Sequence, residues 1–320
     1  MNYSVIVPVF NSEKTISKCL KSLEKQTIKE KFEVIVVDDG STDNTKKEVK
    51  KFKKVKYLYQ KNKGPAAARN FGVRKAKGKI VVFIDSDCEA DKNMLKELIL
   101  PFKNKEIIGA QGSYKSKQTS LMAKFVQIEI ESRYELMKKS KFVDFLSTYC
   151  CAYRKKDFKE ARGFDESFPM ASGEDTELSY KLSKKGKKLI FNSKAFCYHQ
   201  HPTSLIEYLK KKFYRAYWRI QLYSKHKEKA IKDSYTPQTL KIQIFLFFLI
   251  IASIMIELIY STMNLTLTAI ILMLISFIPF FLFALKKDLN LALISPLILF
   301  LRSASFALGL FLGFINKKNN

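Results

Sequence analysis

The first half of the chain alternates between short β-branched runs and amphipathic stretches. Residues 4–9 and 32–37 are apolar runs that predict buried strands, and Ile16, Leu20 and Leu23 recur between them at helical spacing. Because strands and helices alternate, we expect an α/β domain with a mostly parallel sheet covered by helices on both faces. The same pattern predicts further strands at 55–59, 79–84 and 107–111, and helices at 65–73, 92–102 and 121–137.

The last quarter of the chain has a different pattern. Residues 242–260, 265–285 and 289–315 are three almost entirely apolar blocks, each near or above the length that crosses a bilayer. The third block contains Pro296 and Arg302, so a spanning path and a re-entrant path both remain open for it. We therefore expect two to three transmembrane helices.

The short connections between these blocks predict an orientation. Residues 286–288 are positively charged, so this connection is expected on the cytoplasmic side. Residues 261–264 carry no charge, so that connection is expected outside. Arg302 is an ionisable residue within an apolar block, which marks a functional site or, equally well, helix packing or snorkelling to the headgroups.

The composition adds a strong positive charge. The chain has 57 Lys and Arg against 30 Asp and Glu, a formal net charge of +27. A basic domain joined to apolar helices favours anionic membrane lipids over nucleic acid as the polyanionic partner. The five cysteines have no zinc-like spacing and no signal peptide is evident, so we expect reduced thiols and a catalytic domain on the cytoplasmic side of the cell membrane.

The change in pattern predicts three segments. Residues 1–203 form the expected catalytic domain, 204–241 a basic amphipathic helix with a linker, and 242–320 the membrane domain. Within the second segment an apolar face that includes Leu209 lies opposite basic residues such as Lys211, which is typical of a helix lying at a membrane interface.

Two carboxylates follow the predicted strand at 79–84. Asp85 and Asp87, separated by Ser86, would lie at the carboxyl end of that strand. Carboxylate and phosphate oxygens together suit a hard cation such as Mg²⁺ or Mn²⁺, so the pair is suited to hold a diphosphate. Taken alone, the pattern also fits a solvated turn or a helix cap.

Three neighbouring motifs strengthen the case for a site. Residues 38–43 are an acidic turn after a strand, and 64–70 begin a helix with small residues and Arg69, which could reach a phosphate or a base. Glu174 and Asp175 form a second acidic cluster, where a carboxylate could act as general base towards an acceptor hydroxyl.

Taken together, these motifs resemble glycosyltransferase family 2, whose members have the GT-A fold and transfer sugars from nucleotide donors with inversion. The resemblance covers roughly residues 4–220, and the motifs occur in the family's order. Its motifs here are at 5–11, 38–43, 64–70, 85–87, 163–166 and 173–175. The resemblance implies the nucleotide-diphospho-sugar transferase fold, with a Rossmann-like, mostly parallel sheet.

The resemblance also assigns roles to residues. It implies that Asp85 and Asp87 coordinate a divalent cation with the donor diphosphate, that Arg69 approaches the nucleotide, and that Asp175, with Glu174 beside it, supplies the catalytic base. It also implies that Pro8, Phe10 and Asp39 hold the donor's base and that Asn11 and Glu13 bind the donor.

Two later positions extend the predicted site. His199 resembles a family position that sometimes contributes a third metal ligand, although a purely structural histidine fits as well. Arg215 is predicted to meet the donor diphosphate or a lipid phosphate. The segment around it, Arg215-Ala216-Tyr217-Trp218-Arg219, departs from the Gln-x-x-Arg-Trp motif of processive members.

The sequence therefore predicts an inverting glycosyltransferase at the cytosolic membrane face. Its partners would be a nucleotide-sugar donor, a lipid-linked or glycan acceptor such as a polyprenyl phosphate, and membrane lipids, with no nucleic acid. Two alternatives remain open: a processive polysaccharide synthase, and a non-catalytic basic membrane-binding protein on a transferase scaffold.

Overall fold

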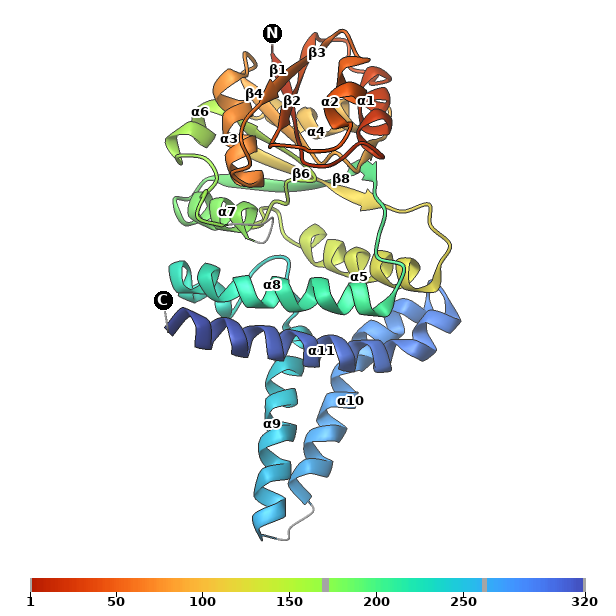
Figure 1. The fold of residues 1–320 in the computed structure, drawn as a ribbon. Helices are drawn as coiled ribbons and strands as arrows, with labels where there is room; N and C mark the ends of the chain where they lie inside the picture. Colours follow the sequence, from red (N-terminus) through yellow and green to blue (C-terminus); the bar gives the residue numbers. More distant parts are fainter. Residues whose placement is uncertain (1, 169–172, 261–263, 319–320) are drawn as a thin grey trace. The chain divides into compact units, whose positions relative to one another are not determined.

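The computed structural model describes residues 2–168, 173–260 and 264–318, and its backbone divides into two compact units. The first unit comprises residues 1–117 and 137–200, and the second comprises 118–136 and 201–320. The helix at 121–136 thus belongs with the C-terminal unit, whereas the sequence pattern placed it inside a domain ending at residue 203. Each unit is described separately below (Figure 1).

The first unit is built on one eight-stranded sheet with the order β3-β2-β1-β4-β7-β6-β8-β5. Strands β3, β2, β1 and β4 are parallel neighbours, whereas β7 is antiparallel to both β4 and β6. The expected mostly parallel sheet is confirmed. The strands are β1 Tyr3–Val9, β2 Phe32–Asp38, β3 Val55–Tyr59, β4 Ile80–Ile84, β5 Glu89–Ala90, β6 Ile107–Lys115, β7 Cys150–Arg154 and β8 Lys188–Tyr198.

Helices connect these strands, and α1, α3 and α4 lie where the periodicity predicts them. Helix α1 buries Ile16, Leu20 and Leu23 against the sheet, because these side chains fall on one helical face. Helix α3 starts with Pro65 at its first turn, where a missing N–H costs nothing. The first unit's helices are α1 Ile16–Glu24, α2 Thr45–Lys50, α3 Pro65–Lys75, α4 Met94–Ile99, η1 Leu100–Lys103, α6 Lys155–Glu160 and α7 Glu174–Lys184.

The register of the central strands decides where the site forms. Val9 at the end of β1 pairs with Asp38 at the end of β2, and Ile6 in β1 pairs with Phe83 near the end of β4. Since these three strands are parallel neighbours, the loops that follow them leave the sheet at the same edge.

The second unit is helical. It contains the amphipathic helices α5 and α8 and three long apolar helices, α9, α10 and α11, which are long and apolar enough to cross a membrane. The three predicted apolar blocks are thus confirmed as helices, although residues 261–263 of the predicted outer loop lie outside the described part of the chain. The helices are α5 Leu121–Lys138, α8 Leu205–Lys225, η2 Lys227–Ala230, α9 Gln238–Tyr260, α10 Asn264–Leu285 and α11 Leu289–Lys318.

Candidate active site

The loops after β1, β2 and β4 are joined by hydrogen bonds. The backbone N–H of Asn11 donates to Ser41 Oγ at 2.9 Å, and the N–H of Thr42 donates to Asn11 Oδ1 at 2.8 Å. The hydroxyls of Ser12 and Ser86 lie 2.9 Å apart and link the first loop to the third. The three predicted motifs therefore converge at one edge of the sheet.

Asp39 fixes the loop that precedes α3. Its carboxylate is almost fully buried and accepts hydrogen bonds from the backbone N–H groups of Lys63 and Gly64, at 2.9 and 2.8 Å, and from the Gln60 amide. Gly64 has φ +89°, a conformation that favours glycine. Asp39 thus shapes the start of α3, and its expected contact with the donor's base remains a prediction.

Three other predicted donor residues lie at the same edge. Glu13 accepts a hydrogen bond from the Asn44 N–H at 2.9 Å, so it holds the loop before α2. Pro8 lies within β1, opposite Val37. Phe10 is half exposed, and its expected contact with the donor's base remains a prediction.

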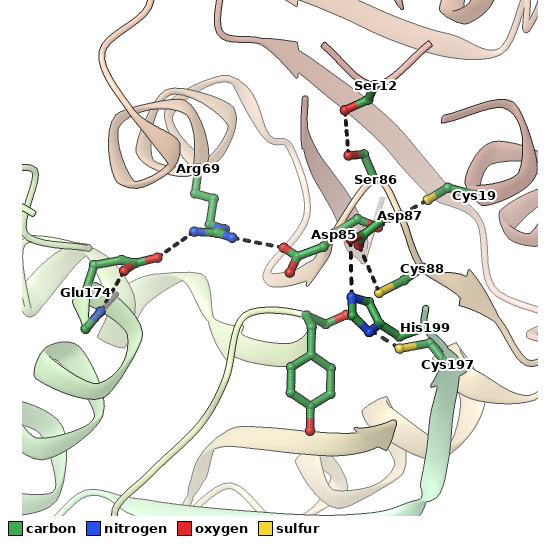
Figure 2. A network of polar contacts seen from close by, with 12 residues as sticks. Ser12, Cys19, Arg69, Asp85, Ser86, Asp87, Cys88, Glu174, Cys197 and His199 are labelled. Atoms are coloured by element: carbon green, nitrogen blue, oxygen red, sulfur yellow. Dashed lines mark hydrogen bonds and ion pairs between the residues drawn. The ribbon is translucent and has the colours of Figure 1, made fainter. Parts of the chain in front are cut away.

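Arg69 is the buried link between two acidic groups. One guanidinium nitrogen lies 2.8 Å from Glu174 Oε1 and the other lies 2.9 Å from Asp85 Oδ1, as Figure 2 shows. The side chain is about 2% exposed. Because the two carboxylates surround it, the pKa of Arg69 is raised further although burial opposes the charge. The Arg69 guanidinium thus connects the predicted base segment with the predicted metal-binding segment.

The carboxylates of Asp85 and Asp87 have different surroundings. Burial raises the pKa of Asp85, and the ion pair with Arg69 only partly offsets this effect. Burial acts in the same direction on Asp87, but the hydrogen bond with His199 outweighs it and lowers the pKa of that group. Asp87 Oδ2 lies 3.2 Å from His199 Nε2. The two carboxylates of one motif therefore face different partners (Figure 2).

These side chains offer an incomplete set of metal ligands. Within residues 2–168, 173–260 and 264–318, no three His, Cys, Asp or Glu side chains are grouped as a ready-made metal site. Asp87 and His199 nevertheless converge, and a carboxylate with an imidazole suits a cation that takes its remaining ligands from a diphosphate and water. The fit is therefore to a cation that arrives with the donor, and Asp85 in its present position binds Arg69.

His199 is held in place by its neighbours. It follows β8, its N–H donates to the carbonyl of Lys115 at 2.9 Å, and its ring stacks on Tyr114 with a centroid distance of 4.5 Å. Tyr114 in turn stacks on Tyr149. Tyr114 is thus a residue that the sequence motifs did not mark, since its role depends on strands β6 and β8 lying side by side.

The predicted base, Asp175, lies in the first turn of α7. Its carboxylate is partly exposed and accepts hydrogen bonds from the N–H and hydroxyl of Thr176. Burial and the adjacent Glu174 raise the pKa of Asp175 to about 6. A carboxylate with this pKa is suited to accept a proton near neutral pH. Glu174, by contrast, is buried and bonded to Arg69, a position suited to orienting the site.

Asn70 holds a further motif against the site. Its amide donates to the Phe164 carbonyl at 2.9 Å and to Glu166 at 2.8 Å, and its oxygen accepts from the Phe164 N–H. The motif at 163–166 is thereby fixed to α3. Asn70 adjoins Arg69 in the sequence motif, and only the folded arrangement reveals this role. The remaining predicted residue, Arg215, lies exposed on α8 in the second unit, so its donor contact remains a prediction.

Comparison with known proteins identifies a family in the N-terminal half of the chain. Residues 4–162 match the model of "Glycosyl transferase family 2". Over its full length the fold is similar to that of a mannosyltransferase from Pyrobaculum calidifontis solved with GDP-Man and Mn²⁺, with a TM-score of 0.65, 18% identity, and coverage of 99% of this chain and 88% of that one. The fold expected from the sequence motifs is confirmed.

Two curated relatives show similar sequence over parts of the chain. A poly(ribitol-phosphate) β-N-acetylglucosaminyltransferase, TarS of Staphylococcus aureus, is 46% identical over 103 residues, which are 30% of this chain and 18% of TarS. Validoxylamine A glucosyltransferase of Streptomyces hygroscopicus subsp. limoneus is 31% identical over 57% of this chain and 48% of that protein. The chain spans less than half the length of these relatives.

Proposed function

The chain belongs to glycosyltransferase family 2, and we propose that it transfers a sugar with inversion from a nucleotide-sugar donor to a lipid-linked acceptor at a membrane surface. The observation that carries the proposal is the continuous contact from Glu174 through Arg69 to Asp85, beside Asp87 and His199. This contact supports the proposal, because the residues proposed as base segment and as metal pair are joined to one another through Arg69.

Asp175 would accept the proton of the acceptor hydroxyl. The deprotonated oxygen then attacks the anomeric carbon, the bond from that carbon to the donor phosphate breaks, and the nucleoside diphosphate leaves with the bonding electrons. A single displacement of this kind inverts the anomeric centre. The raised pKa of Asp175 supports this role, because a general base is most effective when its pKa lies near the pH at which it works.

Charge on the departing diphosphate needs stabilisation. Asp87 and His199 would hold a Mg²⁺ or Mn²⁺ ion, which when bound neutralises developing negative charge on the phosphate oxygens. Arg69 keeps Asp85 and Glu174 in fixed positions by pairing with both.

The lipid-linked acceptor is supported by charge and by apolar helices. The net charge of +27 favours anionic headgroups, and α9 and α10 are long and apolar enough to hold the chain at a bilayer. We propose the cytoplasmic face of the cell membrane, because the basic connection at 286–288 follows the bias of cytoplasmic loops. A polyprenyl phosphate or a lipid-linked glycan fits this setting.

Incubation of membranes that contain the protein with a panel of labelled nucleotide sugars, followed by lipid extraction, tests the proposal. We expect Mn²⁺- or Mg²⁺-dependent label in the lipid fraction, formed at least roughly 100-fold more slowly with Asp175→Asn. Label that stays in a water-soluble glycan would contradict the lipid-linked acceptor, and an absence of donor turnover with every nucleotide would contradict the enzymatic function.

A second acceptor class is supported by a basic hollow in the first unit. This hollow has a volume of about 510 Å³ and is lined in part by Lys18, Lys21, Lys25, Lys92 and Lys117. Its lysines suit a polymer of phosphodiesters, the kind of acceptor that the name of TarS describes. If that is the acceptor, Lys21→Glu combined with Lys92→Glu should raise the acceptor KM and flatten its salt dependence, with donor hydrolysis unchanged.

A further inference from the structure

Helix α11 is apolar enough to cross a bilayer, yet it runs beside a charged helix. Its 30 residues correspond to a length of about 45 Å. Figure 1 shows α11 lying along α8 and crossing the direction of the α9–α10 hairpin. The depth of α11 in the bilayer therefore depends on the depth at which the charged side chains of α8 can lie.

The contact between α11 and α8 is a close backbone contact over several turns. Ser305, Gly309 and Gly313 are four residues apart and form one face of α11. The Ser305 hydroxyl donates to the carbonyl of Leu209 at 2.7 Å. A Cβ added at Gly309 would lie 2.4 Å from the carbonyl oxygen of Phe213. The helices are thus packed too closely to separate into different environments.

Each step of four residues along α11 corresponds to a step of four residues along α8. A Cβ added at Gly313 would lie 2.5 Å from the carbonyl oxygen of Tyr217, four residues beyond Phe213. Asn316, near the end of α11, donates to the Tyr217 hydroxyl at 3.0 Å. The two helices therefore run in the same direction, and the later half of α11 follows α8 turn by turn.

Ion pairs also connect the first half of α11 with charged side chains of α5. Arg302 is buried and lies 2.9 Å from Glu129 of α5, whose other oxygen is 2.7 Å from Lys212 of α8. At the start of α11, Asp288 lies 3.7 Å from Lys124 of α5. Ion pairs thus join the start and the middle of α11 to α5, and its later half lies along α8.

Helix α8 is unsuited to the hydrocarbon core. Lys210, Lys211 and Arg215 are exposed on it, and each would be costly at the centre of a bilayer. Helix α5 carries Lys124 and Glu131 with their side chains at least partly exposed. Because α11 packs along α8 and is joined to α5 by ion pairs, it stays at the level of the headgroups.

The opposite face of α11 is apolar and uncovered. Its most exposed residues include Leu293, Leu297, Leu308 and Phe314, each more than half exposed. These positions follow helical spacing and form one long stripe. Helices α9 and α10 of the same unit are also apolar and exposed, so an apolar environment would suit the stripe and these two helices alike.

We propose that α11 lies in the plane of the membrane beside α8 and does not cross it, with its apolar stripe in the outer part of the hydrocarbon layer. Among the described helices, α9 and α10 are then the two that span. Before Gln238 the described residues contain no helix apolar enough to cross, so both ends of α11 lie on the same side as the sheet-containing unit.

Single introduced cysteines test the sidedness. Lys53→Cys in the first unit, Asn264→Cys at the start of α10 and Asn316→Cys near the end of α11 would be treated with a membrane-impermeant maleimide in sealed vesicles. The five native cysteines are buried and give little background. We expect positions 53 and 316 to react from one side and 264 from the other. Reaction of 316 together with 264 would overturn the proposal.

Depth measurements give an independent test that does not need sidedness. Leu293 and Leu308 are both exposed and are 15 residues apart, which corresponds to about 22 Å along a helix. A fluorophore at Leu293→Cys or Leu308→Cys should be quenched equally by lipids brominated near the headgroup. Depths that differ by most of this length would show a spanning helix, and an absence of quenching at both would show a protein partner on the stripe.

Discussion

Nε2 of His199 lies 3.2 Å from Oδ2 of Asp87, although 112 positions separate the two residues in the sequence. The contact requires the end of β8 to reach the loop after β4. The pair thus joins β8 to the loop that carries Asp87, and under the proposed function it would supply a divalent cation with two ligands of different chemistry.

His199→Gln should weaken metal binding more than it weakens donor binding. With the imidazole gone, we expect the Mn²⁺ concentration for half-maximal activity to rise roughly 10- to 100-fold, as for loss of other groups that hold a metal. Mn²⁺ titration of both activity and electron paramagnetic resonance in the presence of nucleoside diphosphate measures this. His201→Gln is the matched control. An unchanged Mn²⁺ requirement would show that His199 is structural.

Asp175→Asn should remove the base and preserve the fold of the site. We expect transfer to fall roughly 10²- to 10⁴-fold, the contribution of a positioned base, while the dissociation constant of the donor changes little. Calorimetric titration with a nucleoside diphosphate provides the binding measurement. An equal loss of donor affinity would assign Asp175 to donor binding.

The pH dependence of transfer should report the same group. Asp175 has a pKa raised to about 6, and it must be deprotonated to act as a base. The value of kcat/KM should therefore fall tenfold per pH unit below about 6 and level off above it. A profile flat down to pH 5 would exclude a base with this pKa.

Glu129→Gln should destabilise the helical unit. Burial tends to raise the pKa of Glu129, but Lys212, Arg133 and Arg302 outweigh burial and hold it well below its usual range. Removing the carboxylate leaves three buried cations without their partner, which costs about 3–5 kcal/mol in comparable buried pairs. Thermal unfolding in detergent measures the loss.

Glu131→Gln, two residues further along α5, is the matched control. Its contact with Lys287 is partly exposed, so we expect an effect below about 1 kcal/mol. Because the pKa of Glu129 is depressed in the folded state, its contribution is present above the unfolded pKa of roughly 4.3 and is lost as the pH falls below it. Equal effects of the two substitutions would contradict the role assigned to Glu129.

Gly309→Ala should separate α11 from α8. The added Cβ would meet the Phe213 carbonyl, and overpacking of this kind costs roughly 1–3 kcal/mol. Leu308→Ala, on the lipid-facing stripe, is the control and should have a smaller effect. The unfolding temperature of each variant is measured in the same detergent. A lower unfolding temperature for Leu308→Ala than for Gly309→Ala would show that the close contact is absent.

The sequence by itself determined strands β1 to β4 and β6, helices α1, α3 and α4, the three apolar helices, and the acidic motifs after β2 and β4. Local periodicity and turn chemistry carry this information, since burial of one face repeats with the period of the element. The other strands and helices of the first unit were not predicted. The parallel arrangement of β2, β1 and β4 then followed from alternation of strands and helices, and it brought Asn11, Ser41 and Ser86 to one edge.

Only the tertiary structure decided which partner each charged side chain has. Arg69 binds both Asp85 and Glu174, Asp87 meets His199, and Arg302 meets Glu129. Helix α5 also joins the C-terminal helices, a grouping that the sequence pattern did not predict. Contacts between residues so far apart along the chain depend on strand register and helix packing, which a one-dimensional pattern does not encode.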